Sequence, residues 1–370
     1  MNILKKLFER DDVGIELGSA NMRVWVMGKG LAMEEPSAVT LAVSREEMQE
    51  LEDDPRGPQG SKPSGKPCKY RILAVGAEAG EMIGKTPGNL VVIRPMKGGV
   101  ICDYHVTKEM FRYCFTHQKV KESCKGGFRR PRVVIAVPSG ITEVEKRAVE
   151  DAAHSARAGD VFLIEATMAA AIGAGIPVAE PKGSMVVDIG ASATNMAAIS
   201  LAGIVNSNAL RVGGDEMSNA IIAYLHKKYN LLAGDREAED VKIKIGTACK
   251  PEKELDYEIK GLDAAEGRKL AVTVNSKEIR EDALAGVLGQ IESALKEFIA
   301  HVEPGLAADI AENGIVLTGG GALLPGLGKR LADATGLPVR VADDPAHATI
   351  RGVAVVLDEL DFLSKKASKR

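Results

Sequence analysis

Residues 14–27 read GIELGSANMRVWVM, and residues 187–200 read VDIGASATNMAAIS. The two stretches share one plan: an apolar strand, an acidic residue, a glycine, small polar residues and a second apolar strand. They lie about half a chain apart, which indicates two related domains. Each hairpin turn would offer backbone N–H groups to phosphate oxygens, and its small side chains permit close approach.

Strands and helices alternate along the rest of the chain. The apolar patterns predict strands at 71–75, 90–93, 132–138, 161–164, 184–189 and 314–318, with strand signals over 196–212. They predict helices at 106–118, 142–156, 165–175, 215–229, 236–247 and 280–302. This alternation predicts an α/β protein. Residues 52–67 are rich in Pro, Gly, Lys and Ser, so we interpret them as a solvated loop.

Composition narrows the function classes. The chain has 370 residues, enough for two domains of average size, and a net charge of -3. Neither that charge nor an aromatic content of 4% favours a nucleic-acid partner. The five cysteines form no CxxC pair and the six histidines show no paired-ligand spacing. We therefore expect reduced thiols in a cytoplasm and no metal site built from protein ligands alone.

Two further glycine turns support a nucleotide site. They are VGGDEMS at 212–218 and LTGGGALL at 317–324, and each precedes a predicted helix. A helix N-terminus favours anions, and four such turns are stronger evidence than one. The acidic residues before the hairpin glycines, Glu16 and Asp188, are expected to hold a magnesium ion through water.

The N-terminus, MNILKKLFER, has the pattern of a short basic amphipathic helix. Ile3, Leu4, Leu7 and Phe8 fall on one helical face, with lysines and an arginine toward the other. Such a helix binds an anionic bilayer surface. The alternative is a first turn that packs on its own domain.

Long strings of the sequence resemble the MreB family of bacterial actin homologues, from about residue 12 to residue 360. They include IELGSAN (15–21), PRVVIAVPSGITEVEKRAV (131–149), GSMVVDIGASATN (183–195), RVGGDEMSNAII (211–222) and LTGGGALLPGL (317–327). The resemblance implies the actin-like two-lobe ATPase fold, an α/β fold of duplicated ribonuclease H-like domains with a small insert in each lobe. ATP and Mg²⁺ would lie between the lobes.

The resemblance also implies a domain division and a set of binding residues. The first lobe would span 1–150 with its insert at 32–78, the second 151–338 with its insert at 230–278, and 339–370 would return to the first lobe and end in a basic tail. The residues that match ATP-binding positions of the family are Gly18, Ser19, Ala20, Asn21, Gly190, Ala191, Ser192, Ala193, Gly213, Gly214, Asp215, Glu239, Lys242, Gly319, Gly320, Gly321 and Ala322. Glu16 replaces the usual aspartate, which should disturb the water shell of the magnesium ion.

Two positions depart from the pattern expected for hydrolysis. The family's IEEPMAAA and DIGGGTTE place a glutamate and a threonine around the attacking water, whereas this chain has Ala166 and Ala193. Alanine accepts no hydrogen bond, and positioning of the water supplies much of the rate. We therefore expect ATP to bind and to be hydrolysed slowly or not at all. The neighbouring Glu165 should point elsewhere on a regular backbone.

Members of this family form protofilaments that usually pair antiparallel. They lie at the inner membrane face, and they work with transmembrane wall-elongation proteins to guide cell shape. The resemblance thus implies a cytoplasmic, peripheral filament protein, with Phe128 as a second membrane contact; an ordinary basic surface turn is the alternative at that position. Two other functions stay open: an ATPase filament that cycles through another water contact, and a non-polymerising nucleotide-binding scaffold or regulator of an intact relative.

Overall fold

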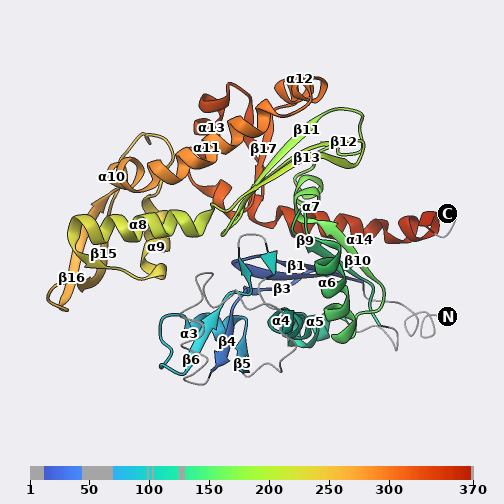
Figure 1. Cartoon of the computed structure of the whole chain (residues 1–370), viewed down its shortest axis with the longest axis horizontal. Helices are drawn as coiled ribbons and strands as arrows, with labels where there is room; N and C mark the ends of the chain where they lie inside the picture. Colours follow the sequence, from blue (N-terminus) through green and yellow to red (C-terminus); the bar gives the residue numbers. More distant parts are fainter. Residues whose placement is uncertain (1–11, 44–69, 98–99, 102–103, 125–129, 368–370) are drawn as a thin grey trace. The chain divides into compact units, whose positions relative to one another are not determined.

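The computed structural model describes residues 12–43, 70–97, 100–101, 104–124 and 130–367, in two compact units (Figure 1). The first unit comprises the described residues up to Gly173 and those from Thr349 onward. The second unit is Ala174–Ala348. The sequence analysis placed these boundaries at 150/151 and 338/339; the units divide 23 residues later at the first boundary and 10 later at the second.

A five-stranded sheet forms the centre of the first unit, in the order β10-β9-β1-β2-β3. Its strands are β1 (Val13–Leu17), β2 (Asn21–Val26), β3 (Gly30–Pro36), β9 (Val133–Val137) and β10 (Val161–Glu165). The first three form an antiparallel meander, and β1, β9 and β10 run parallel. The predicted strand–turn–strand at 14–27 is therefore present as β1 and β2.

Both faces of this sheet are covered, which explains the unbroken apolar run of β9. Val133, Ile135 and Val137 pack in one core cluster with α4 (Tyr104–Thr116) and α6 (Glu143–Ser155). Val134 and Ala136 point the other way, into a cluster with α7 (Ala166–Gly173) and α14 (Ala348–Ala367). A strand that is buried on both faces has no solvent-facing side, so its sequence does not alternate between apolar and polar residues.

The rest of the first unit is a smaller sheet with short helices. The sheet has the order β5-β4-β6, from β4 (Val39–Ala42), β5 (Arg71–Val75) and β6 (Leu90–Ile93), all antiparallel. The remaining elements are α3 (Ala77–Met82), α5 (Gln118–Ser123) and the short pair β7 (Met96–Lys97) and β8 (Val100–Ile101). Residues 52–67, predicted to form a solvated loop, lie outside the described residues.

The second unit repeats the central sheet. Its order is β13-β12-β11-β17-β18, and its strands are β11 (Ser184–Ile189), β12 (Thr194–Ser200), β13 (Gly203–Leu210), β17 (Ile315–Thr318) and β18 (Val339–Val341). Here too the first three strands form an antiparallel meander, and the remaining two continue parallel to β11. The same order and directions in both units match the repeat seen in the sequence.

A second small sheet lies at one end of this unit. It contains β14 (Leu231–Leu232), β15 (Asp256–Asp263) and β16 (Lys269–Asn275), all antiparallel. Helix α8 (Gly214–Tyr229) leads from the central sheet to this small sheet, and α9 (Asp235–Ile245) lies between β14 and β15 in the chain (Figure 1). The β15–β16 hairpin was not predicted from the sequence; its strands are half-exposed, and β15 carries four charged residues, Asp256, Glu258, Lys260 and Asp263.

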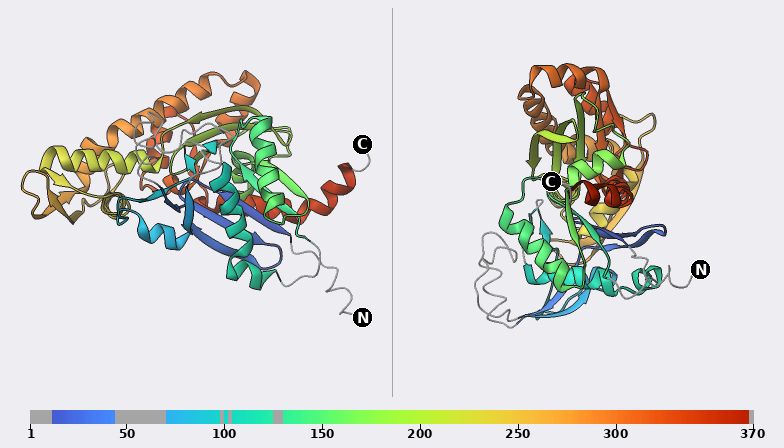
Figure 2. Two further views of the ribbon diagram at one scale, coloured as in Figure 1. Left: turned by 60° about the horizontal axis from the view of Figure 1, so that its bottom comes forward. Right: turned by 90° about the vertical axis from the view of Figure 1, so that its right-hand side faces the viewer.

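Helices complete the second unit. Ser276–Ala300, predicted as one helix over 280–302, consists of α10 (Ser276–Glu278), a π-helical stretch η1 (Ile279–Leu284) and α11 (Ala285–Ala300). Figure 2 shows α11 alongside α8, and one apolar cluster joins both helices to β11 and β17. The other elements are α12 (Pro304–Asn313), η2 (Gly320–Leu323), α13 (Leu327–Thr335) and η3 (Pro345–His347).

Candidate nucleotide-binding site

The first hairpin turn is short and fixed at both ends. The Gly18 N–H donates to the Asn21 carbonyl at 3.0 Å, which closes the turn over Ser19 and Ala20. The Ser37 N–H donates to the Ala20 carbonyl at 2.8 Å, which ties the turn to the end of β3. The four predicted phosphate-loop residues therefore form one turn at the edge of the central sheet.

An ion-paired ladder crosses the three strands beside this turn. In the strand register, Glu16 on β1 lies opposite Arg23 on β2, and Arg23 lies opposite Glu34 on β3. Arg23 Nη1 lies 3.1 Å from Glu16 Oε1, and its Nε donates to Glu34 Oε1 at 2.8 Å. Burial opposes the charge of Arg23, but the attraction of Glu16 and the bond to Glu34 outweigh it and raise the pKa of Arg23.

This ladder engages Oε1 of Glu16, and the magnesium role of Glu16 stays a prediction. A carboxylate that orients the water shell of a metal ion must accept hydrogen bonds from that water. Here the Glu16 side chain is 13% exposed and one of its oxygens is bonded to a guanidinium. In the second unit, Asp188 Oδ1 accepts from the Thr318 hydroxyl at 2.9 Å. The described part of the chain holds no group of three or more His, Cys, Asp or Glu placed to bind a metal ion.

The second hairpin turn is closed like the first and is also bonded to a helix. The Gly190 N–H donates to the Ala193 carbonyl at 2.8 Å. The first amides of α8 donate back to the turn: Gly214 to the Gly190 carbonyl at 3.0 Å and Asp215 to the Ala191 carbonyl at 2.7 Å. The predicted phosphate turn and the predicted nucleoside-binding turn are thus joined directly.

Close approach explains the glycines at this junction. A Cβ on Gly213 would lie 2.6 Å from both the Gly190 and the Ala191 carbonyl oxygens, which no ordinary Cβ tolerates. Gly319 has φ of +81°, and a Cβ there would lie 2.4 Å from the Ile189 carbonyl oxygen. The predicted adenine-side loop at 319–322 therefore packs directly on the end of β11.

A polar network links α9 to the start of α8. Lys242 Nζ donates to the Gly214 carbonyl at 2.8 Å and pairs with Glu239 Oε2 at 2.6 Å. The Ser218 hydroxyl, not predicted as a site residue, donates to the same Glu239 oxygen at 2.8 Å. The predicted residues of the second unit thus form one connected cluster. Neither Ser218 nor Arg23 carries a local motif, so only the strand register and helix spacing could have suggested them.

The two alanines at the predicted water-positioning sites offer only methyl groups. Ala166, the first residue of α7, packs on the apolar cluster formed by β9 and α14. Ala193 is 6% exposed at the end of the second turn. Beside Ala166, the hydroxyls of Thr167 and Ser139 lie 2.5 Å apart, and Thr167 is 1% exposed. These hydroxyls bond to each other beside the buried core.

The predicted membrane contacts, Ile3, Leu4, Leu7, Phe8 and Phe128, lie outside the described residues. Among the residues that are described, no helix combines the length and apolar character needed to cross a bilayer.

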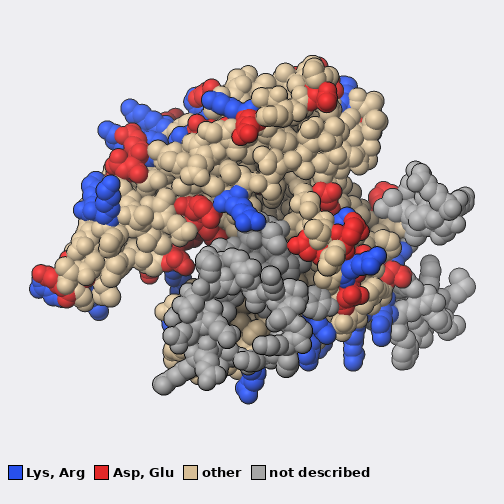
Figure 3. Space-filling model, viewed as in Figure 1, with Lys and Arg blue, Asp and Glu red and all other residues tan. Residues whose placement is uncertain are grey.

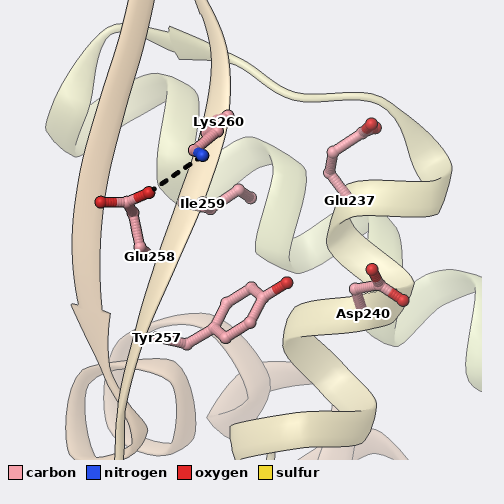
Figure 4. A pocket seen from close by; sticks show the side chains of 6 residues that line it. All are labelled: Glu237, Asp240, Tyr257, Glu258, Ile259 and Lys260. Carbon is pink, nitrogen blue, oxygen red and sulfur yellow. Dashed lines mark ion pairs between the residues drawn. The ribbon is translucent and has the colours of Figure 1, made fainter.

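A hollow on the second unit was not predicted from the sequence. It has a volume of about 260 Å³ and lies between α9 and β15 (Figure 4). Its walls carry Glu237, Asp240, Tyr257, Glu258, Ile259 and Lys260. Lys260 pairs with Glu258, and the surface at this end carries Lys and Arg next to Asp and Glu (Figure 3). Exposed pairs of this kind contribute little stability.

Comparisons with known proteins agree with the fold. The chain is 41% identical over 360 residues to the cell shape-determining protein Mbl of Bacillus subtilis (strain 168), covering 97% of this chain and 99% of that protein. It is 43% identical over 354 residues to the cell shape-determining protein MreB of Escherichia coli (strain K12), a match that covers 95% of this chain and 94% of that protein.

Two solved structures are similar. The structure of MreB5 of Spiroplasma citri bound to AMPPNP has a TM-score of 0.83 and 29% identity, and covers 97% of this chain and 99% of that one. The structure of the MamK double helical filament has a TM-score of 0.71 and 20% identity, and the match covers 95% of this chain and 99% of that one. At this identity the similarity indicates the fold alone.

The repeated sheets and these structural neighbours define an actin-like α/β protein. A profile described as MreB/Mbl protein matches residues 10–365. The chain belongs to the MreB/Mbl family.

Proposed function

We propose that this protein binds ATP and assembles into filaments that guide cell shape and wall synthesis. The observation that carries the nucleotide proposal is the connected cluster of the second unit. There, two glycine turns are bonded to each other, and Lys242 bonds to the first turn of α8. A tight turn of small residues bonded to a helix start lets a phosphate chain approach the backbone closely. Glu239 and Lys242 match the family positions beside ribose and adenine.

The relatives support the same proposal. MreB5, with a TM-score of 0.83, was solved bound to AMPPNP and, separately, bound to ADP. Mbl and MreB carry the description cell shape-determining, and this chain is matched to them over nearly its whole length. MamK, which shares the fold, was solved as a double helical filament. We infer self-association of this chain from its membership of the MreB/Mbl family, and antiparallel pairing of its protofilaments from the sequence resemblance to that family.

Hydrolysis is proposed to be slow or lost. Ala166 and Ala193 present methyl groups where an acceptor for the attacking water is expected, one in each unit. Loss of a single polar stabilising group costs about 10²- to 10³-fold in rate. Binding does not need these acceptors, so nucleotide-driven assembly would persist while turnover falls.

The site in the cell is proposed to be the cytoplasmic face of the inner membrane. The amphipathic pattern of the first ten residues supports this location, because Ile3, Leu4, Leu7 and Phe8 share one helical face. Transmembrane proteins of wall elongation are the proposed partners. The competing proposal is a non-polymerising nucleotide-binding scaffold or regulator of an intact relative.

Sedimentation of the purified full-length chain with and without ATP, followed by electron microscopy of the pellet, tests the proposal. We expect nucleotide-dependent paired filaments. A chain that binds ATP by calorimetry yet stays monomeric under every nucleotide condition would contradict the filament function and favour the regulator. A chain that binds no ATP would contradict both.

A further inference from the structure

The Ser218 hydroxyl is a buried link between two helices of the second unit. Ser218 lies on α8, one helical turn after Gly214, and is 7% exposed. Its Oγ donates to Glu239 Oε2 on α9 at 2.8 Å and lies 3.1 Å from the Gly214 carbonyl oxygen. It also accepts from Lys242 Nζ at 3.1 Å. One small hydroxyl therefore contacts the start of α8 and both members of the Glu239–Lys242 pair.

Lys242 uses its protons within the protein. An ammonium group has three protons to donate and accepts no hydrogen bond. Lys242 Nζ lies 2.8 Å from the Gly214 carbonyl oxygen, 2.6 Å from Glu239 Oε2 and 3.1 Å from Ser218 Oγ, so three protein acceptors match three protons. Its side chain is 13% exposed. Lys242 therefore holds its neighbours in place.

Glu239 is held by one oxygen and presents the other. Oε2 receives the bonds from Ser218 and Lys242, whereas none of the residues that the structure describes is hydrogen-bonded to Oε1. The Glu239 side chain is 45% exposed, in contrast to the groups that hold it. An ionised carboxylate only accepts hydrogen bonds. The ligand group that this oxygen recognises must therefore be a donor.

A nucleotide offers two kinds of donor on its nucleoside, the ribose hydroxyls and the exocyclic amine of adenine. The start of α8 is bonded to the second hairpin turn, where the phosphates would lie, and Ser218 is one turn, about 5.4 Å, further along the helix. The ribose is the group that follows the phosphates along a nucleotide. Resting on the proposed nucleotide binding, we propose that Ser218 is a positioning residue, which holds Glu239 so that its second oxygen accepts a hydrogen bond from a ribose hydroxyl.

Calorimetric titration of the full-length chain with ADP, 2′-deoxy-ADP, 3′-deoxy-ADP and inosine diphosphate, all in excess Mg²⁺, tests this proposal. At least one deoxy analogue should bind about tenfold more weakly than ADP, because a hydrogen bond to a charged group is lost. Inosine diphosphate lacks the exocyclic amine and should bind within about threefold of ADP. Equal affinities of ADP and both deoxy analogues would overturn the proposal. So would a selective loss with inosine diphosphate, which would assign the oxygen to adenine.

Ser218→Ala separates positioning from a general structural role. The variant removes one of the two bonds that orient Glu239, so ADP should bind more weakly while the Kd of the weaker deoxy analogue stays within about twofold. The ratio of these two Kd values should fall from about tenfold to about threefold or less. A structural defect in α8 would weaken both nucleotides equally and leave the ratio unchanged, which would overturn the role of Ser218.

Ser293→Ala on α11 is the matched control. The Ser293 hydroxyl bonds back to the Gly289 carbonyl at 2.9 Å, one turn earlier in its helix, as Ser218 does to Gly214. Among the described residues it is hydrogen-bonded to no carboxylate. This variant should keep the ratio of the unmodified chain, and a ratio that falls in both serine variants would count against the proposal.

Glu239→Ala gives a second test, because it removes the acceptor itself and should bring the ratio near one. Adding Ser218→Ala to this variant should leave the Kd for ADP within about twofold, since a residue that acts through Glu239 has nothing left to position. A ratio that stays near tenfold in Glu239→Ala, or a further loss in the double variant, would overturn the proposal. Absence of binding of every nucleotide to the unmodified chain would instead remove the proposed function on which the inference rests.

Discussion

At the residue scale, the proposed loss of hydrolysis rests on two methyl groups. The turns that would hold phosphates are intact, whereas Ala166 and Ala193 lack an acceptor for water. Thr167 follows Ala166 on α7, and Ser139 lies in the turn after β9. They bond to each other, and Thr167 is buried. A compensating water contact from this pair would require that bond to break.

The double variant Ala166→Glu, Ala193→Thr should restore turnover. Both acceptors return to the positions where the family places them, so phosphate release should rise by about 10²-fold or more. The measurement is the steady-state phosphate-release rate with excess Mg-ATP. Each single variant serves as a control and should give a smaller gain. An unmodified chain that already matches the double variant would show that another group positions the water.

Gly213→Ala tests the junction between the two turns of the second unit. The added Cβ would lie 2.6 Å from two carbonyl oxygens, so the start of α8 must shift away from the second turn. We expect at least a tenfold weaker Kd for AMPPNP. Gly286→Ala on α11 is the matched control, because a Cβ at Gly286 meets no atom within 4 Å and Gly286 lies outside the predicted site. Equal affinities of the two variants would refute the proposed contact of this junction with the nucleotide.

At the element scale, one carboxylate joins α8 to the helices that follow β16. Glu278 Oε2 accepts from the hydroxyls of Tyr224 at 2.6 Å and Tyr229 at 2.8 Å, and it pairs with Lys228. Its other oxygen accepts from the Asn275 N–H, which caps α10. Burial by itself would raise the pKa of Glu278, but the bonds from Lys228 and Tyr224 lower it to about 2.

Glu278→Gln should destabilise the second unit in a pH-dependent way. A carboxylate whose folded pKa is depressed contributes its stability above the unfolded value, about 4.3, and loses it as the pH falls toward 2. At pH 7 we expect a loss of about 2 kcal/mol in the free energy of unfolding. Denaturant unfolding followed by circular dichroism checks this. The gap between the two proteins should narrow below pH 4.3; a gap independent of pH would count against the ionic origin.

At the scale of the whole molecule, the fold is one sheet design used twice. Each unit has an antiparallel meander, two parallel strands and a glycine turn between its first two meander strands. The small sheets and helices added to each design differ in size and order. A ligand that engages a folded unit and not its unfolded chain stabilises that unit by mass action.

Saturating AMPPNP should therefore raise the unfolding temperature of the chain. At a free concentration of about 100 times the Kd, binding adds about 2.7 kcal/mol to the stability of the unit or units engaged. Differential scanning calorimetry with and without the analogue measures the shift. If the unfolding temperature of one unit rises and that of the other does not, the unit with the unchanged temperature makes no net contribution to binding. That result would argue against a phosphate role for its turn.

Sequence alone determined the features that depend on neighbouring residues. The repeat at 14–27 and 187–200, the α/β class and the glycine turns are local patterns, since alternation and turn residues act over a few positions. The predicted strands at 71–75, 90–93 and 184–189 have the same bounds in the structure. Helix α6 differs from its predicted bounds by one residue at each end, because it begins after the cap residue Thr142 and ends at Ser155, whereas the helix predicted from 280 begins four residues earlier, at Ser276 after the cap Asn275.

Only the tertiary structure decided which of these residues meet. The pairing of Arg23 with Glu16 depends on hairpin register, and the bond from Lys242 to the Gly214 carbonyl joins residues 28 positions apart. The β15–β16 hairpin was missed although Tyr257 and Ile259 on β15, and Leu270, Val272 and Val274 on β16, alternate with exposed residues; in β15 this alternation is interrupted by Gly261. Such contacts follow from how strands and helices pack. For that reason the sequence predicted the glycine turns, whereas only the fold placed an arginine against the carboxylate expected to serve a metal.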